Sequence, residues 1–503
     1  MELSFDSKPF HYLKSIINEF RCQEETAEVI VPDSFPDIAE IVDYDAQLLI
    51  RGKEFRNGNV QISGGIRGDI MHIPEDRSTA RTLELYIPFS MKVDDPAFSE
   101  NSQLICDARI RSVDGRMINS RKAMLRVNVG CMLMSYEDEQ EQLFTCSQNP
   151  EFIQLKTASY PVRIPVETSE KSFVISDTFA LPHADPELNQ VFKFHCDLTV
   201  VEKKIVANKA VFKGNAVCSV MYFNTEGSLS KTLCKIPFSQ YCELTKDYEY
   251  EKPDLYPVLT GYDLKLLTEN GDQQIEASLN ILMQCIVTGE QRLDVVEDAY
   301  SVYGLLEPQW HSYPLKGWLD EQDSIQAMNL YLPGQVREVV DLRFFIDQPI
   351  ISSREDIKSI IIPVNCRVLG YDANQNICSV SGRGEVHYEL AAEEYAECYI
   401  HSARSSDPYS VMQSEGVCVR GDIELTIVCC AGSEINTICG GHILVDGEEE
   451  TQMPSVVLKK AAAGESLWEI GKANRAKSNA IRAANQLDSD CLDHDQLLLI
   501  PIG

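Results

Sequence analysis

The sequence is short of basic residues and has no long apolar run. Lys and Arg total 45 against 77 Asp and Glu, which gives a formal net charge of -32. A chain with this charge is repelled by phosphate backbones and by anionic lipid, so nucleic acid and membrane surfaces are poor partners. No run approaches the ~18 apolar residues of a membrane-spanning helix, and the start of the chain is polar and acidic. We therefore expect a cytoplasmic protein with no direct membrane insertion.

The usual catalytic motifs are also missing. The chain has no Gly-x-x-x-x-Gly-Lys-Ser/Thr loop, no His-Glu-x-x-His helix and no Gly-x-Ser-x-Gly elbow. Cys429-Cys430 followed by Cys439 and His442 offers thiolates and an imidazole that suit zinc, but alternation in a predicted hairpin already explains their burial. We expect no enzyme, no cofactor and no metal site.

The residues that are present predict a folded, mainly β protein. Apolar residues make up 44% of 503 residues, enough for several hydrophobic cores. Seventeen cysteines is an odd number, and most lie in apolar strand-like runs, which favours buried reduced thiols. Runs such as 209–223 alternate polar and apolar side chains, and Asx-Gly pairs such as Asp114-Gly115 or the turn Asn224–Gly227 interrupt them. The pattern indicates antiparallel hairpins in a sandwich or a barrel; the sequence does not separate these two.

The chain contains a threefold internal repeat. Pro32, Pro182 and Pro333 begin similar segments and lie about 150 residues apart, a typical domain size. Gly64 and Gly214 follow in register, and Ile-Pro-Phe-Ser occurs in both of the first two copies. The third copy lacks that step and is divergent. These observations predict three tandem β domains.

The segment that precedes the first copy has a helical spacing of apolar residues. Phe10, Leu13, Ile16, Ile17 and Phe20 recur at intervals of three and four. We expect an amphipathic helix that covers the first β domain, with a docking helix for a partner as the alternative.

The last fifty residues differ from the rest. Val456–Leu458 is β-prone, Ser466 with Glu469 forms a capping box that starts a helix at about Leu467, and a second helical run and a final strand follow. This strand, helix, helix, strand order, with Gly464-Glu-Ser-Leu-Trp-Glu-Ile470 and Asn485-Gln-Leu487, resembles a LysM domain over its whole length. The resemblance implies two helices packed on a two-stranded sheet, with a shallow groove that commonly binds N-acetylglucosamine-containing glycans.

The resemblance also implies which residues form the groove. The matching loop positions are Gly464, Glu465, Ser466, Leu467, Asn485, Gln486, Leu487 and Asp488. The chain departs from the family at His494-Asp495, where Pro-Gly is usual, and at 473–476 between the helices. We expect Trp468 to pack in the core between the helices instead of forming an exposed sugar platform.

The upstream repeat resembles a second family. Val31-Pro-Asp-Ser-Phe-Pro-Asp37-Ile38, then Gly64, then Ile87-Pro-Phe-Ser90 is similar to the SPOCS domain of endospore coat proteins. Tandem SPOCS units ending in one LysM resemble clostridial coat-morphogenesis proteins. The resemblance implies a mother-cell cytoplasmic scaffold, recruited to the forespore surface and spore coat, whose LysM docks on a coat ATPase like stage IV sporulation protein A. The alternative function is a peptidoglycan-binding or GlcNAc-glycan-binding protein of the cell wall or spore cortex.

These patterns divide the chain into six predicted segments. They are an N-terminal helix segment (1–27), SPOCS-type domains at 28–170, 171–322 and 323–446, an acidic linker (447–454) and a LysM domain (455–503).

Overall fold

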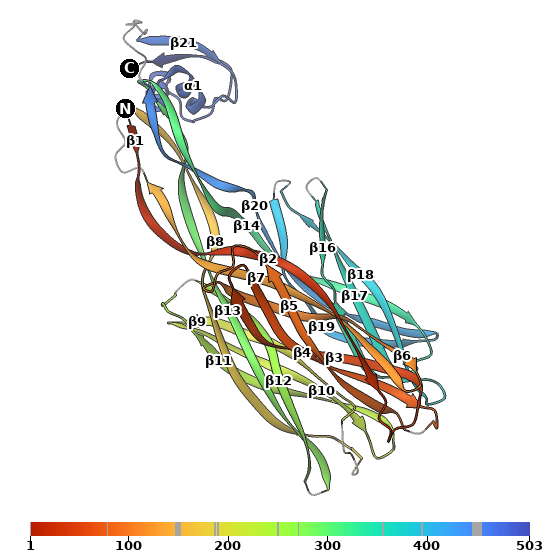
Figure 1. Cartoon of the computed structure of the whole chain (residues 1–503). Helices are drawn as coiled ribbons and strands as arrows, with labels where there is room; N and C mark the ends of the chain where they lie inside the picture. Colours follow the sequence, from red (N-terminus) through yellow and green to blue (C-terminus); the bar gives the residue numbers. More distant parts are fainter. Residues whose placement is uncertain are drawn as a thin grey trace.

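The computed structural model describes residues 2–77, 79–145, 152–185, 188, 191–248, 251–269, 271–354, 357–393, 396–444 and 455–502. It is mainly β, as predicted, and its sheets are open and built from antiparallel strand pairs. Figure 1 shows an elongated body, a narrower stalk that rises from it, and a small helix-containing module at the end of the stalk, where both chain ends also lie. The predicted linker at 447–454 falls outside the described residues.

The body is built from three sandwiches, each with an outer and an inner sheet. In the first, the outer sheet has the order β2 (Asp6–Ile30), β7 (Lys122–Thr145) and β6 (Gln103–Asn119). The inner sheet is a meander of β3 (Ile38–Arg56), β4 (Asn59–Pro74) and β5 (Arg81–Asp94). The first strand therefore pairs with the last, and the three middle strands pair with their sequence neighbours.

The same strand order recurs twice. The second sandwich joins β8 (Ile153–Ala180), β13 (Asp272–Ser301) and β12 (Lys252–Glu269) to the meander β9 (Lys193–Val206), β10 (Lys209–Phe223) and β11 (Leu229–Glu243). The third joins β14 (Leu305–Pro333), β20 (Gly416–Leu444) and β19 (Ala396–Gln413) to β15 (Glu338–Ile346), β16 (Ile350–Arg354), β17 (Ile357–Tyr371) and β18 (Ile377–Ala391). The N-terminal strand β1 (Glu2–Ser4) adds to β20 of this third sandwich.

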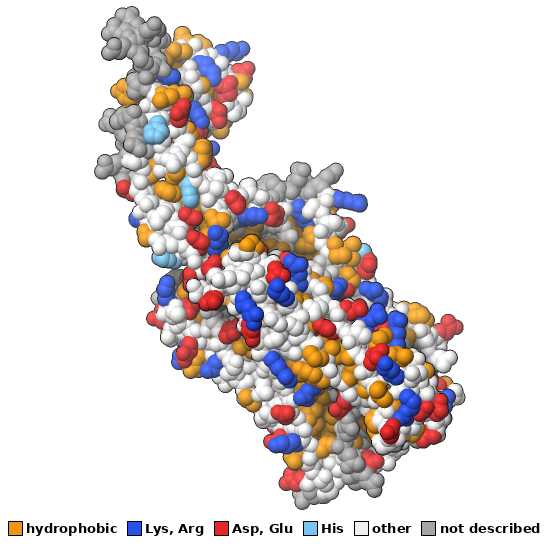
Figure 2. All heavy atoms as spheres, in the orientation of Figure 1, with side chains coloured by type: hydrophobic (Ala, Val, Ile, Leu, Met, Phe, Trp, Pro, Cys, Tyr) orange, Lys and Arg blue, Asp and Glu red, His pale blue; other side chains and the backbone are white. Residues whose placement is uncertain are grey.

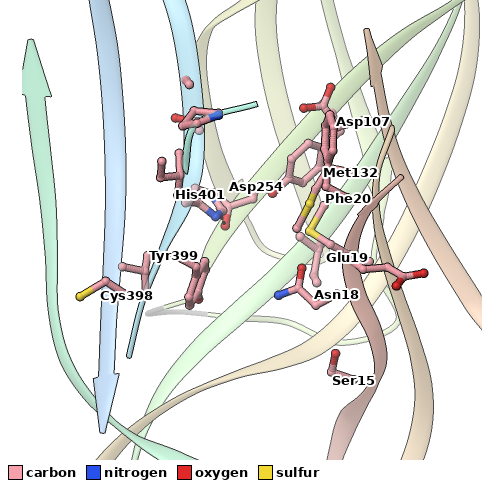
Figure 3. Close-up of a pocket in the computed structure, with 18 of the residues that line it drawn as sticks. Ser15, Asn18, Glu19, Phe20, Asp107, Met132, Asp254, Cys398, Tyr399 and His401 are labelled. Atoms are coloured by element: carbon pink, nitrogen blue, oxygen red, sulfur yellow. Dashed lines mark ion pairs between the residues drawn. The ribbon is translucent and has the colours of Figure 1, made fainter. Parts of the chain in front are cut away.

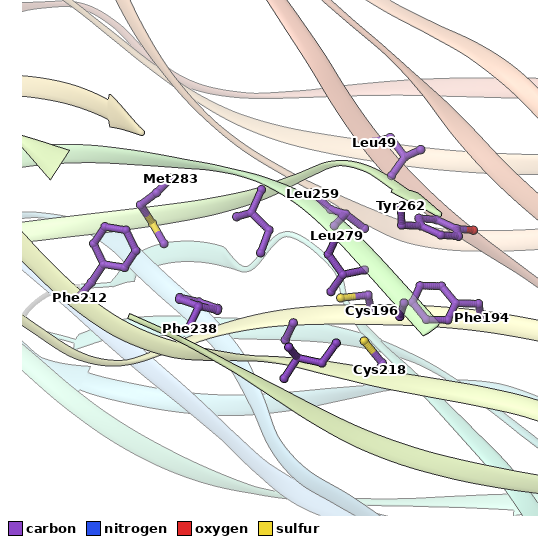
Figure 4. Packing of buried hydrophobic residues seen from close by; sticks show 14 of the residues in the cluster. Leu49, Phe194, Cys196, Phe212, Cys218, Phe238, Leu259, Tyr262, Leu279 and Met283 are labelled. Atoms are coloured by element: carbon purple, nitrogen blue, oxygen red, sulfur yellow. The ribbon is translucent and has the colours of Figure 1, made fainter. Parts of the chain in front are cut away.

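Each sandwich holds its own apolar core between its two sheets. Alternate residues of the facing strands point inward, as expected for half-buried strands. In the second sandwich Phe212, Phe238, Cys196 and Cys218 of the meander lie in one cluster with Leu279 and Met283 of β13 (Figure 4). Because the sheets do not close on themselves, the sandwich and not the barrel describes each unit.

Three of the predicted domain boundaries fall inside long strands. Those at 27/28, 170/171 and 322/323 fall inside β2, β8 and β14, and each of these strands pairs with the last strand of its own sandwich. The repeated prolines that suggested the boundaries stand at or just after the end of each first strand, because proline cannot continue a hydrogen-bonded ladder. The first strand of each sandwich begins at Asp6, Ile153 or Leu305, which is about 25–30 residues before the proline of its repeat.

The predicted N-terminal helix is also wrong, because residues 6–30 form strand β2 against β7. Tyr12 and Leu13 are both buried although they point to opposite faces, since each face of the strand is covered by a different cluster. A bulge between Ser15 and Ile17 then displaces the alternation by one residue. Burial on two faces plus one bulge produces the spacing that resembled a helix.

One predicted turn lies inside a strand. Asn224–Gly227 does connect β10 to β11, with Gly227 at φ +74°. Gly115, in contrast, sits within β6, where a Cβ atom would lie 2.5 Å from the Tyr44 ring. That glycine serves a close approach between two sheets and does not make a turn.

The stalk consists of the far ends of β2, β7, β8, β13, β14 and β20. These strands are up to 30 residues long and extend beyond the sandwiches (Figure 1). Their side chains meet in one cluster that draws on all three sandwiches, comprising Tyr12, Val162, Ile164, Leu293, Val295, Tyr313 and Ile435. The stalk is therefore a shared structure of the three repeats.

At the other end of the body, corresponding residues of the three inner sheets meet. Met71, Met221 and Leu369 pair in register with Asp43, Lys193 and Asp341 on the first strands of the three meanders. The three apolar residues lie in one cluster, with Val42, Phe192 and Val340 around them as a second corresponding set. The repeats thus surround a common axis with approximate threefold symmetry.

The axis also carries a buried ionic cluster. Lys193 is 6% exposed, and its Nζ lies 2.6 Å from Asp341 Oδ2, 3.1 Å from Asp43 Oδ2 and 3.5 Å from Asp45 Oδ2. Burial raises the pKa of Asp43, whereas for Asp341 burial is outweighed by Lys193 and Lys231, so that its pKa is lowered. Arg343 Nε lies 3.1 Å from Asp45 Oδ2 and adds a second cation. Buried carboxylates need such partners, so the three repeats hold one another through charge.

Candidate functional site

The C-terminal module holds the residues that the sequence singled out. Its elements follow in the predicted order: β21 (Val456–Ala461), α1 (Leu467–Asn474), α2 (Ser478–Asn485) and β22 (Gln496–Pro501). Ser466 caps α1, because its Oγ accepts a hydrogen bond from the Glu469 N–H at 3.1 Å. The helices and the two strands enclose a small separate core that contains Leu467, Ile481 and Leu498.

The first predicted loop is held against the segment before β22. Gly464 takes φ +86°, a conformation that favours glycine, and its N–H donates to the Leu492 carbonyl at 2.7 Å. Glu465 O accepts from Leu492 N–H at 3.0 Å, and its side chain lies 3.0 Å from Lys459 Nζ. The hydrogen bond from Lys459 holds the pKa of Glu465 below its usual range. Leu467 is fully buried, so its side chain supports the fold and is not available to a ligand.

The second predicted loop follows α2. Asn485 Nδ2 donates to the carbonyls of Ile481 and Leu499, and its Oδ1 accepts from the Leu499 N–H at 2.8 Å, so this side chain fastens the helix to β22. Gln486 ends the helix in the left-handed conformation at φ 53°. Leu487 packs against the module core, and Asp488 is exposed. Gln486 and Asp488 therefore present the open part of this loop.

The outer face of the small sheet is apolar and exposed. Leu458 of β21 lies opposite Leu499 of β22, and both point away from the helices. Leu458 and Leu497 are 65% and 63% exposed, and Val456 and Leu499 extend the same surface. The predictions from sequence missed this face, although the alternation of 456–460 and 496–500 carries the signal.

The module is attached to the stalk through α1. Trp468 Nε1 donates to Asp298 Oδ2 at 2.7 Å, and Lys472 Nζ lies 2.7 Å from Asp298 Oδ1, near the end of β13. The Trp468 ring meets the Tyr300 ring edge-on at 4.8 Å, and Tyr300 Oη donates to the Ala476 carbonyl at 2.8 Å. Burial raises the pKa of Asp298, but the hydrogen bonds from Lys472 and Trp468 outweigh it and lower the pKa overall.

Trp468 is therefore not in the module core, where the sequence pattern placed it. It is half-buried between the module and β13, and the partners Asp298 and Tyr300 lie about 170 residues upstream. A local pattern cannot reveal a partner at that separation. A Cβ on Gly471 would lie 2.5 Å from Tyr300 Oη, so this glycine allows the close contact.

The candidate zinc ligands do not come together. Cys429, Cys430, Cys439 and His442 lie along one continuous strand, β20, and the predicted hairpin does not form. Ten residues of strand span about 30 Å, so the two pairs cannot share one ion. Within the described residues no group of His, Cys, Asp or Glu is arranged to hold a metal, and sixteen described cysteines are free thiols.

The comparisons with known proteins bear on the second sandwich. A family model described as SipL, SPOCS domain, matches residues 187–267, a range that spans β9, β10 and β11 and most of β12. Residues 187–267 are thus similar to the SPOCS domain of SipL. The match indicates a sporulation-related context, in keeping with a spore-coat theme. No curated protein and no solved structure matches the chain.

No described helix is both long enough and apolar enough to cross a lipid bilayer.

Proposed function

We propose that this chain is a non-enzymatic adaptor of endospore coat assembly. In this proposal the three sandwiches are SPOCS-type units, and residues 455–502 are a LysM-type module that docks on a protein partner. The partner is a coat ATPase like stage IV sporulation protein A at the forespore surface. The family match supports the sporulation context, and the shared strand order supports extending the SPOCS assignment to the first and third sandwiches.

The observation that carries the proposal is the way in which the C-terminal module is attached to the stalk: helix α1 contacts β13, and the loops stay exposed. Helix α1 is fixed to β13 by Trp468 and Lys472, so this side is already occupied. Gly464, Gln486 and Asp488 remain exposed at the end of the stalk. A small folded module held away from a large body is accessible to a partner that is itself part of an assembly.

The contact between α1 and β13 also favours a protein partner over a glycan. Aromatic rings stack on sugars only when a ring face is free, and the aromatic ring of α1 is Trp468. That ring packs against Tyr300, and its indole N–H is used by Asp298. The module therefore does not offer this tryptophan as a sugar platform.

Co-purification of the purified full chain with the ATPase tests the proposal. A double variant, Gln486→Asn with Asp488→Lys, changes the exposed loop and keeps a residue that tolerates the left-handed conformation. We expect at least a tenfold loss of ATPase binding, with an unchanged circular dichroism spectrum. The control variant Asn479→Ala, on an exposed position of α2, should bind like the native chain.

Two outcomes contradict the proposal. Undiminished binding by the double variant, with loss in Leu497→Glu, would place the docking surface on the outer sheet face and not on the loops. Sedimentation of the full chain with peptidoglycan sacculi, without binding to the ATPase, would favour the glycan-binding alternative.

A further inference from the structure

A cavity lies where the stalk joins the body. Its volume is about 460 Å³, within the range of small-molecule sites. Figure 2 shows apolar side chains gathered in a hollow at this level of the molecule. The lining comes from all three sandwiches, through β2, β6 and β7 of the first, β8, β12 and β13 of the second, and β14, β16, β19 and β20 of the third.

Much of the wall is apolar or aromatic. Phe20 and Met132 line one side, and Tyr399 with its neighbours on β19 lies across the cavity from them (Figure 3). Tyr256 and Trp318 add two further rings. Thioether and aromatic side chains adapt to flat apolar molecules, so the wall suits an aromatic or aliphatic body.

The charged groups of the wall already have oppositely charged partners, some in the wall and most next to it. Asp254 is 6% exposed, and its carboxylate lies 2.7 Å from Lys203 Nζ and 3.6 Å from His401 Nε2. The remaining charged lining residues have partners too: Glu19 with Arg21, Asp107 with Arg109, Arg163 with Glu321, Lys316 with Glu397 and Asp347 with Arg111. A charged ligand would enter without a counter-charge and would lose its hydration, which is costly.

The cavity keeps hydrogen-bond donors free. Tyr136, Tyr256 and Tyr399, one from each sandwich, line the wall, and within the described residues their phenol oxygens have no hydrogen-bond partner. Burial raises the pKa of all three phenols, so each keeps its proton at neutral pH. A ligand with a carbonyl or ether oxygen would satisfy one or more of these donors.

We propose that this cavity binds an uncharged, largely apolar small molecule that carries a hydrogen-bond acceptor. Because the wall is contributed by three sandwiches and the base of the stalk, such a ligand would join all of these parts. The inference is independent of the partner that the C-terminal module binds.

Fluorescence titration of the full chain with Nile red tests the proposal. Nile red is neutral, flat and apolar and carries a carbonyl acceptor, whereas anilinonaphthalene sulfonate is a similar aromatic probe with a negative charge. We expect saturable binding of one Nile red per chain, and at least tenfold weaker binding of the anionic probe. Equal affinity for the two probes, or no saturation by Nile red, would overturn the proposal.

Variants identify the site. Met132→Trp fills the cavity and should weaken Nile red binding at least tenfold, whereas Leu233→Trp, on an exposed position of β11, should leave it unchanged. Tyr399→Phe preserves the shape of the wall but removes one donor, so it should weaken binding about two- to tenfold and keep the fold intact. Equal behaviour of the Leu233 and Met132 variants, or native affinity in both cavity variants, would show that the probe binds elsewhere.

Discussion

Lys193 stands at the threefold axis where the other two repeats supply aspartates. One cation between Asp43 and Asp341 adds to the partners that Arg367 and Lys231 already give these buried carboxylates. Three identical residues at this position would leave like charges in contact. The repeats therefore differ at the axis, and this difference fixes which surfaces of the three sandwiches meet.

Replacing this lysine tests that role. Lys193→Met removes the cation but keeps a long apolar side chain, and it leaves buried negative charge only partly compensated by Lys231 and Arg367. We expect the free energy of unfolding to fall by about 3–5 kcal/mol, the usual cost of breaking a buried pair, as measured by urea denaturation. The matched change Lys14→Met breaks a solvent-exposed pair with Glu139 and should cost little. Similar small losses in both variants would contradict a structural role for the axis cluster.

His72 makes the stability of the first sandwich depend on pH. It is fully buried in β4, and burial, assisted by Arg81, lowers its pKa below the ordinary value of 6.5. As the pH falls, His72 therefore binds a proton more readily in the unfolded chain than in the folded chain. Its contribution to the free energy of unfolding is complete above about pH 6.5 and is lost as the pH falls below that value.

Denaturation at pH 7.5 and at pH 5.5 measures this effect. One proton contributes at most about 1.4 kcal/mol per pH unit. We expect His72→Leu to reduce the loss of stability between the two pH values, whereas His494→Leu, at an exposed position, should not. An unchanged pH dependence in the His72 variant would exclude this histidine as the cause.

Among the strands of the inner sheets, the glycines that correspond in the first two repeats have one structural role. A Cβ on Gly64 would lie 2.0 Å from the Leu49 carbonyl oxygen, and one on Gly214 would lie 2.2 Å from that of Thr199. A strand of the inner sheet thus approaches its neighbour closely, at or within two residues of a register shift in both repeats.

Alanine substitution tests this equivalence. Gly64→Ala and Gly214→Ala should each lower the free energy of unfolding by about 1–3 kcal/mol, the range for a forced backbone shift. Gly261→Ala, where the nearest atom is a side-chain nitrogen at 3.3 Å, should be tolerated better. Denaturant titration of the three variants gives the comparison, and equal losses in all three would argue against a special role for the first two positions.

The contact between α1 and β13 holds the C-terminal module against the stalk. Asp298→Ala removes the acceptor of both Trp468 and Lys472, so we expect the module to detach from the stalk while the body stays folded. Small-angle X-ray scattering should then show a larger maximum dimension. Asp294→Ala changes an exposed residue on the same strand and should leave the scattering curve unchanged. Identical curves for both variants would mean that other contacts hold the module.

The sequence predicted the elements whose signals are local. The capping box at Ser466, the strand alternation of 209–223 and the spacing of the repeated prolines each depend on neighbours along the chain. The helix expected around Phe10 and the boundary at 170/171 were wrong because a long strand paired with a partner more than a hundred residues away decides both. The predicted groove stays a prediction: Gln486 is exposed in its loop, but the burial of Leu467 and the contact of Trp468 with Tyr300 depend on tertiary packing that a local pattern does not carry.

In the molecule as a whole, the three repeats pack into one body and are not independent domains joined by linkers. Each has its own core, yet the axis cluster, the cavity and the stalk all draw on the three together. The pairing of β1 with β20 ties the start of the chain to the third repeat. This arrangement supports the C-terminal module at the end of the stalk.

The proposed function requires that this body present its C-terminal module to a protein partner at the forespore surface. Fluorescence microscopy of a labelled chain in sporulating cells, with and without residues 455–503, examines that requirement in the cell. We expect a ring around the forespore with the full chain and diffuse mother-cell fluorescence without the module, at equal protein levels. A ring that persists without residues 455–503 would contradict the proposed function.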